Sequence, residues 1–383
     1  MRLLKKIAKV LLITILSLVV LGFLTYKIVT SGTEFGGKMD QQSLSKAERS
    51  PQYDLEEEHF RNRPDVLPNS LMTNWEDMRG GQERVPPGSF PMEIPKISQQ
   101  LDSTGIKATW IGHATVYIEM DGKRILTDPM FSERAFPVKL VAPERFNPPS
   151  IAVKDLPQVD IVTISHDHFD HLDMKSVQTL AAKGSQFYVG IGIKAHLMEW
   201  EIAEGQINEM DWWETVVLDN FKIHCTPARH YSGRTSMNNS TLWTSWVIEG
   251  PEHKIFHSGD SGYQSHFKEI GDRFGTIDMG FIKVGDYGLD PGWRDIHMYT
   301  EQSVQAGVDI NAQLLFPIHW GTFDLSNHDW YEPINLAVQF AEQQQIPLVT
   351  PKLGQTITYG NPIINETWWK ELEASSEEIK SKD

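Results

Sequence analysis

The feature that most constrains this chain is a cluster of histidines and aspartates directly after an apolar run. Residues 160–164 read Asp-Ile-Val-Thr-Ile, and residues 165–173 read Ser-His-Asp-His-Phe-Asp-His-Leu-Asp. A short, nearly continuous apolar run is typical of a central strand that is buried on both faces. We therefore expect the cluster in a loop at the end of a buried strand. The alternative, a solvated polar loop, leaves the concentration of histidines without a role.

Imidazole and carboxylate groups together are ligands that zinc favours in proteins. His166 and His168 are predicted to converge on one ion, while Asp170 and His171 turn toward a second. A site for two ions needs further ligands, which we expect at the ends of other strands. Three such residues follow apolar or alternating runs, namely His230, Asp260 and His319. A lone residue of this kind is more often structural, so these three matter because they complete the first cluster.

Residues 106–365 have the pattern of a folded α+β catalytic domain. Apolar or alternating runs predict strands at 116–120, 123–127, 160–164, 221–226, 242–249, 254–258, 279–284 and 313–318. An Asp-Gly pair at 121–122 predicts a tight hairpin turn between the first two. Helical spacing appears at 173–183, 264–274, 300–308 and 333–343. Because helices fall between groups of strands, we expect two packed sheets with helices outside.

The candidate ligands resemble, in their order, those of the metallo-β-lactamase superfamily. The matching residues are His166, His168, Asp170, His171, His230, Asp260 and His319, with early motifs at 109–115 and 127–129. The resemblance implies an αββα four-layer sandwich. It implies that the first metal is held by His166, His168 and His230, and the second by Asp170, His171 and His319. Asp260 would bridge the two ions, Asp128 would support the ligands from behind, and His113 would be structural.

A narrower resemblance, over roughly residues 60–365, is to the N-acyl-phosphatidylethanolamine phospholipase D family. It is carried by residues 211–213 (Asp-Trp-Trp), 259–263 (Gly-Asp-Ser-Gly-Tyr), 269–275 (Glu-Ile-Gly-Asp-Arg-Phe-Gly), 318–323 (Ile-His-Trp-Gly-Thr-Phe) and 126–135. The resemblance implies catalytic roles for Asp170 and for His297, which falls where this family carries an active-site histidine. Residues 286–290 (Asp-Tyr-Gly-Leu-Asp) and the hydrophobic N-terminus depart from the family's pattern.

The resemblance implies a zinc-dependent phosphodiesterase with two Zn²⁺ per chain. A water shared by the ions would attack phosphorus and release phosphatidate and N-acylethanolamine. His297 would orient the phosphate or aid proton transfer to the leaving alkoxide. The alternative is a lactonase or another acyl or phosphoester hydrolase of the same fold. A non-enzymatic binding protein with a hydrolase fold would be expected to lack at least one metal ligand. Diiron relatives usually carry a carboxylate at the position of His168.

The N-terminus predicts attachment to a membrane. Four cations within residues 1–9 precede an uncharged stretch at 10–26, which reaches the short end of what a spanning helix needs. Residues 1–30 are predicted to be a membrane anchor or a signal sequence, and the lack of a convincing cleavage motif after Phe23 favours a retained single-pass anchor. The cations in front of the span place the catalytic domain outside the cytoplasm, in the periplasm if the protein is bacterial.

The flanking segments are predicted to lie outside the catalytic core. Residues 31–105 are expected to form a polar tether followed by a Pro-rich segment that wraps the domain, because few of the early residues are aliphatic. Residues 366–383 carry many acids and are expected to be a solvated tail.

The net charge and the cysteine content limit the binding partners and the covalent cross-links that are expected. The 383 residues include 35 Lys and Arg against 51 Asp and Glu, a formal net charge of −16. Nucleic acid is therefore not an expected partner, because phosphate binding needs a surplus of cations. The expected partners are a phospholipid substrate and the membrane, with a homodimer as a candidate assembly. The single cysteine, Cys225, excludes an intramolecular disulfide. Its place inside a predicted strand disfavours antibiotic hydrolysis, for which many superfamily enzymes use a cysteine at the second metal.

Overall fold

The computed structural model describes residues 2–67, 83–98, 100–139, 142–235, 237–288 and 290–380. Parts of the expected organisation lie outside the described residues. They are Met1 of the predicted anchor, residues 68–82 and 99 of the Pro-rich wrapping segment, residues 140–141, 236 and 289 of the catalytic domain, and residues 381–383 of the acidic tail.

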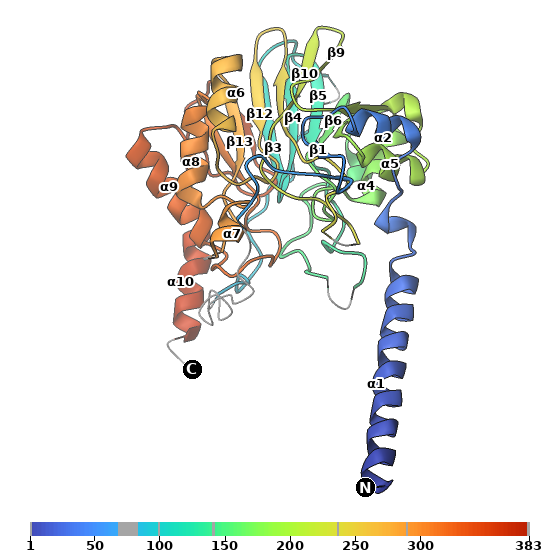
Figure 1. Cartoon of the computed structure of the whole chain (residues 1–383). Helices are drawn as coiled ribbons and strands as arrows, with labels where there is room; N and C mark the ends of the chain where they lie inside the picture. The colour runs from blue at the N-terminus through green and yellow to red at the C-terminus, as the bar shows by residue number, and fades with distance from the viewer. Residues whose placement is uncertain are drawn as a thin grey trace.

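Two mixed sheets form the centre of the catalytic domain (Figure 1). The first sheet contains β3 (Ile106–Gly112), β4 (Thr115–Met120), β5 (Lys123–Thr127), β6 (Ile161–Ile164), β7 (Gln186–Gly190), β8 (Ile207–Met210) and β15 (Thr356–Thr358), in the order β15-β3-β4-β5-β6-β7-β8. The second contains β9 (Thr215–Leu218), β10 (Phe221–Thr226), β11 (Ser245–Glu249), β12 (Lys254–His257), β13 (Met279–Lys283) and β14 (Leu315–Ile318), in the order β14-β13-β12-β11-β10-β9. One hydrophobic core joins them, since Ile118 of β4 and Phe256 of β12 belong to the same buried cluster.

Helices cover both outer faces of the pair of sheets. On one side lie α4 (Met174–Ala181) and α5 (Ile193–Glu199), and on the other α6 (His266–Phe274), α8 (Thr300–Asp309) and α9 (Glu332–Gln344) (Figure 1). Short turns of helix form η2 (Val153–Asp155), η3 (Glu204–Gln206) and α7 (Pro291–Arg294). The predicted αββα sandwich is confirmed. The apolar run at 161–164 is buried throughout, as a central strand requires.

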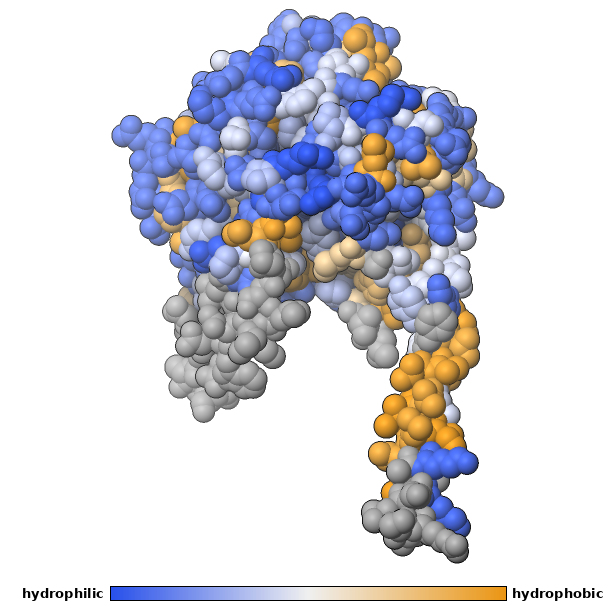
Figure 2. Space-filling view, in the orientation of Figure 1, coloured by the Kyte–Doolittle hydropathy of each residue, from blue (hydrophilic) through white to orange (hydrophobic). Residues whose placement is uncertain are grey.

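The first helix, α1 (Arg2–Val29), projects away from the domain at the end opposite the β9–β10 hairpin (Figure 1). Residues Leu11–Ile28 have a mean hydropathy of 2.2, and none of this window is buried in the structure. Figure 2 shows α1 as a largely hydrophobic rod beside a mainly hydrophilic domain surface. By length and composition α1 can cross a membrane, although a signal sequence has the same properties.

Residues 33–62 differ from the polar tether expected there, because they fold onto the catalytic domain. They form η1 (Thr33–Phe35), α2 (Gln41–Ala47), β1 (Tyr53–Asp54) and β2 (His59–Phe60). The buried side chains of Ala47, Tyr53 and Phe60 share a cluster with Leu242 and Trp243. The segment supplies too few apolar groups for a core of its own, but it needs only enough to cover a surface that the domain already offers.

The C-terminal segment also differs from the solvated tail expected for it. It forms α10 (Trp369–Lys380), preceded by Trp368. Trp369 is only 1% exposed, and its indole N–H donates to Asn335 Oδ1 at 2.7 Å. Trp368 stacks on Trp320 with 5.6 Å between ring centroids. The acidic composition of the segment gave no sign of this contact. Burial of two large aromatic side chains is enough to hold the helix on the domain, even though many of its other residues are charged and exposed.

Replacing Trp369 with alanine is expected to lower the free energy of unfolding by about 3–5 kcal/mol, the usual cost of emptying a buried aromatic site. Urea denaturation of the purified protein measures this change. Lys370→Ala provides the matched control, because the Lys370 side chain is 50% exposed on the same helix. Equal stability of the two variants would mean that α10 does not contribute to the core.

Candidate metal centre

The polar side chains of the site come from loops at one edge of the sandwich. β5 and β6 run parallel in the first sheet, and β12, β13 and β14 run parallel in the second. β10 has the same direction as β12, since each is antiparallel to β11. The carboxyl ends of strands that share a direction meet at one edge, which is where α/β proteins usually bind ligands. Asp128, the 166–171 loop, His230, Asp260 and His319 all follow such ends.

The first group of side chains contains His166, His168 and His230. His168 Nδ1 lies 2.8 Å from His166 Nε2 and 3.2 Å from His230 Nε2. His230 Nδ1 lies 3.1 Å from the Ile296 carbonyl, so it is the nitrogen that carries the proton and Nε2 is left with its lone pair. The three nitrogens lie close enough together to hold one metal ion.

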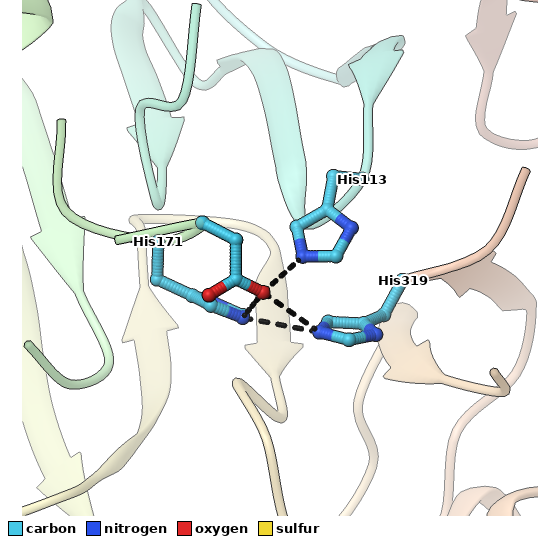
Figure 3. Close-up of side chains that lie close together, drawn as sticks. His113, His171 and His319 are labelled. Carbon is cyan, nitrogen blue, oxygen red and sulfur yellow. Dashed lines mark hydrogen bonds and ion pairs between the residues drawn. The ribbon is translucent and has the colours of Figure 1, made fainter. Parts of the chain in front are cut away.

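The second group contains Asp170, His171 and His319, and His113 lies against it. His171 Nε2 is 3.4 Å from Asp170 Oδ2 and 3.1 Å from His319 Nε2. The rings of His113, His171 and His319 point toward one place (Figure 3). His113 Nε2 is 2.8 Å from Asp170 Oδ2, so the residue expected to be structural contacts a predicted ligand directly. A hydrogen bond from His113 would fix the orientation of that carboxylate.

Asp260 lies between the two groups. Its Oδ2 is 3.4 Å from His171 Nε2 and 3.8 Å from His230 Nε2, and its Oδ1 is 3.0 Å from His319 Nε2. The turn that carries it depends on Gly259, which has φ +53°. A Cβ at Gly259 would overlap the Ser165 side chain, so only glycine lets this turn approach the 166–171 loop so closely. The structure thus brings all seven predicted ligands together, and their binding of metal stays a prediction.

Three of the buried groups, His166, His230 and Asp260, have charge states that suit metal ions. Burial lowers the pKa of His230 to about 3 and lowers the pKa of His166 well below its usual value. Both imidazoles are therefore neutral at pH 7 and keep a lone pair for a ligand bond. Burial alone would raise the pKa of Asp260, but the neighbouring His319 and His171 outweigh it and hold that pKa well below the usual range. The carboxylate is ionised, as a bridge between two cations must be.

The donor set fits zinc. In the first group two imidazole nitrogens face each other across 2.8 Å, and in the second two face each other across 3.1 Å. Lone pairs at such distances repel unless a proton or a cation lies between them. Neutral imidazole and carboxylate are borderline ligands of the kind that zinc prefers.

Asp128 contacts His171 on the side of the ring away from the other predicted ligands. Asp128 Oδ2 lies 2.7 Å from His171 Nδ1, and its Oδ1 accepts the Ser165 N–H at 2.7 Å. The contact fixes a proton on Nδ1, so Nε2 is the nitrogen of His171 that could hold a metal. This is the supporting role that the resemblance implies for Asp128.

Asp128→Asn is expected to weaken zinc binding about 10- to 100-fold, which is the usual effect of losing such a supporting carboxylate. Chelator competition on the purified protein measures it. Asp160→Asn is the control, since Asp160 accepts a backbone N–H at the start of β5, away from the ligands. Unchanged zinc affinity in Asp128→Asn would mean that another group orients His171.

His297 lies beside the two groups, as the resemblance implies. Its ring stacks on Trp293 with 4.7 Å between centroids, and its Nδ1 is 3.9 Å from Asp260 Oδ2. The loop after α7 places it, because His297 N–H donates to the Trp293 carbonyl at 2.8 Å. Burial lowers the pKa of His297 well below its usual value, so the ring is neutral at pH 7.

Two charged residues of the site were missed by sequence reasoning. Asp286 Oδ2 lies 3.6 Å from His297 Nδ1, and burial raises the pKa of Asp286 to about 7. Lys283, at the end of β13, is fully buried, and its ammonium donates to the Gly285 carbonyl at 2.7 Å. A lysine that closes an apolar strand was the available signal for Lys283. Asp286 was visible only as the first residue of the loop that departs from the resembled family.

The backbone is strained at the same place. His113, Asp128, Asp286 and His319 have φ of 54°, 35°, 59° and 61°, which side chains with a Cβ rarely adopt. Such conformations cost about 1–3 kcal/mol each and cluster at functional sites. His224 does not belong to the cluster, because it lies within β10, packs against Phe274 and bonds the Thr215 hydroxyl.

Comparison with known proteins agrees with this geometry. A family model described as a β-lactamase superfamily domain matches residues 123–320 of the 383-residue chain. The chain belongs to this superfamily. Because the fold, the relatives and the buried clusters of metal-binding side chains agree, it is a metal-dependent hydrolase.

Three relatives are informative. An uncharacterized protein of Mycobacterium tuberculosis is 37% identical over 300 residues, which cover 77% of this chain and 80% of the relative. An N-acyl-phosphatidylethanolamine-hydrolyzing phospholipase D of Caenorhabditis elegans is 33% identical and covers 60% of this chain and 67% of its own. A Klebsiella pneumoniae protein named outer membrane protein RomA is 45% identical over 103 residues, 27% of this chain and 76% of that one.

Solved structures show the same fold at low sequence identity. A Veillonella parvula protein described as a possible metal-dependent hydrolase aligns with a TM-score of 0.53 at 17% identity, over 67% of this chain and all of that one. A metallo hydrolase of Ignicoccus hospitalis aligns with a TM-score of 0.51 at 20% identity, over 68% of this chain and all of that one. At these identities the likeness concerns the fold alone.

Proposed function

We propose that this superfamily member is a zinc-dependent phosphodiesterase that hydrolyses N-acyl-phosphatidylethanolamine-type phospholipids to phosphatidate and N-acylethanolamine. The observation that carries the proposal is the position of Asp260 between two groups of buried ligands. That arrangement suits two ions about 3.5–4 Å apart, the spacing used for in-line attack on phosphate esters. The name of the C. elegans relative supports the substrate class.

Zinc binding is assigned to side chains that the fold already brings together. His166, His168 and His230 would hold one ion, Asp170, His171 and His319 the other, and Asp260 both. When bound, two zinc ions lower the pKa of a water near them and neutralise charge on phosphoryl oxygens. Asp170 takes part in this chemistry as a ligand, and His113 fixes the direction of its carboxylate.

His297 is the proposed partner of the phosphate and of the leaving oxygen. Its ring is neutral, and Trp293 stacked on it limits its rotation. His297 Nδ1 lies 3.9 Å from Asp260 Oδ2 and 3.6 Å from Asp286 Oδ2, so this nitrogen faces the proposed metal centre. A histidine held in this way can bind a phosphoryl oxygen or donate a proton to the departing alkoxide.

The substrate class also suits the N-terminal helix. We propose that α1 is retained as a single-pass anchor and that the catalytic domain lies outside the cytoplasm. An enzyme held at a bilayer meets its lipid substrate at a high effective concentration. The name of the Klebsiella relative is compatible with an envelope location. A protease-accessibility assay on cells whose outer barrier has been removed and whose cytoplasmic membrane is intact tests the orientation, and protection of the domain would contradict it.

The test of the reaction is a panel of phospholipids incubated with the zinc-loaded full-length protein in mixed micelles. Mass spectrometry of the products is expected to find N-acylethanolamine together with phosphatidate. A lactonase or other acyl hydrolase of this fold would release no phosphomonoester from these lipids, and lysophospholipid with free fatty acid as the products would overturn the proposal.

A further inference from the structure

The residues that follow α1 lie against the loop that carries the predicted metal ligands. We call residues 33–37 the juxtamembrane segment. Phe35 is 7% exposed and packs edge-on against Phe169, with 5.5 Å between ring centroids. Phe169 stands between His168 and Asp170 of the loop. The Trp200 indole N–H donates to the Thr33 carbonyl at 2.6 Å and fixes the start of the segment on the domain.

One buried guanidinium joins this segment to the loop. Arg234 Nη2 and Nε donate to the Glu34 carbonyl at 2.7 and 3.0 Å. Its Nη1 donates to the carbonyls of Asp167 and Leu172 at 2.7 and 3.0 Å. The same group lies 3.9 Å from the centre of the Phe169 ring. Asp167 directly follows the first residue of the ligand series and Leu172 directly follows the last, so Arg234 spans the loop and ties its two ends to the juxtamembrane segment.

A second path runs through His196 of α5. His196 Nε2 lies 3.3 Å from Asp167 Oδ2, and the other oxygen of Asp167 accepts the Gly233 N–H at 2.8 Å. Gly36 has φ +83°, and a Cβ there would overlap the His196 ring. The segment is therefore seated directly on a side chain that holds Asp167, the residue between two predicted ligands.

Burying the Arg234 guanidinium costs free energy, which its hydrogen bonds must offset. Arg234 is only 6% exposed, and a buried cation must be repaid by hydrogen bonds. Here the bonds go to main-chain carbonyls of the metal loop and of the juxtamembrane segment rather than to distant surface groups. Loss of a group that holds metal ligands in place typically lowers metal affinity about 10- to 100-fold.

We propose that Arg234 is a positioning residue and that the juxtamembrane segment, through Arg234, Phe169 and His196, holds the metal-binding loop in its working geometry. The juxtamembrane segment then does more than connect α1 to the domain, because it also stabilises the metal-binding loop. This inference rests on the proposed ligands of the 166–171 loop, but it does not depend on which ester the enzyme hydrolyses.

The test uses the full-length protein in detergent and compares three single variants. Gly36→Ala unseats the segment, because its Cβ meets the His196 ring, and Arg234→Lys keeps the charge but loses the planar fork. Gly205→Ala is the control, since a Cβ at Gly205 meets nothing within 4 Å. Hydrogen exchange of peptides covering 31–38 and 164–173 is measured without zinc, and chelator competition gives zinc affinity.

Gly36→Ala and Arg234→Lys are each expected to speed exchange at 164–173 and to weaken zinc binding about 10- to 100-fold, whereas Gly205→Ala changes neither. In the double variant the losses should be less than multiplicative, because both changes loosen the contact of the same segment with the same loop. If Gly36→Ala fails to fold, Phe35→Ala takes its place. Faster exchange at 31–38 with unchanged exchange at 164–173 and unchanged zinc affinity would overturn the inference. Failure of lipid hydrolysis with these effects intact would reject only the proposed substrate.

Discussion

Asp260→Ala is expected to abolish hydrolysis and to reduce the zinc content of the purified protein. The Asp260 carboxylate lies within 3.8 Å of nitrogens from both ligand groups, so its loss removes the one anion that the groups share. Two cations held a few Å apart would then repel each other with less compensation, at a cost of several kcal/mol. Turnover is therefore expected to fall by about 1,000-fold or more.

Asp272→Ala is the matched control for that variant. Asp272 lies on α6, and its side chain is 65% exposed. It pairs with Lys268 and not with any of the predicted ligands. Activity and zinc content should both stay at the wild-type level in this control. Wild-type turnover in Asp260→Ala would remove the assignment of Asp260 as the bridging ligand.

His297→Ala is expected to lower turnover by about 100- to 10,000-fold while leaving zinc content unchanged, as the loss of a proton-transfer or phosphate-orienting group does. The reason is its place beside the two groups, with Nδ1 3.9 Å from Asp260 and the ring stacked on Trp293. Steady-state kinetics and elemental analysis of the same preparation separate the two effects.

The opposite pattern is informative because His230, Asp260 and His297 lie close enough to hold an ion by themselves. Loss of zinc from His297→Ala would mean that His297 is a ligand and that its catalytic role has been misassigned. A Trp293→Phe variant, which keeps an aromatic ring under His297, should retain most of the activity.

The fold and the candidate ligands could be predicted because their signals are local. The apolar run at 161–164 predicted a central strand, and the ligand cluster follows it within the same few residues. His230, Asp260 and His319 each stand at the end of a strand with its own hydrophobic pattern. Strands that share a direction end at one edge, so the topology brings together what the sequence separates.

The remaining features depend on partners that are distant in the sequence. Phe60 is buried by contact with the region around Leu242, and Trp369 by contact with the region around Asn335. The average composition of a segment does not show that a few of its apolar side chains pack against an apolar surface of the catalytic domain. Asp286 is similar, because its significance comes from its distance to His297 and from burial that raises its pKa to about 7.

The central claim is that seven side chains form one centre for two metal ions. Elemental analysis of the full-length protein, purified without chelators and supplied with zinc, tests it most directly. The account predicts two zinc ions per chain in the wild type and a clear loss in His166→Ala. A wild-type protein that folds and yet retains no transition metal would contradict it.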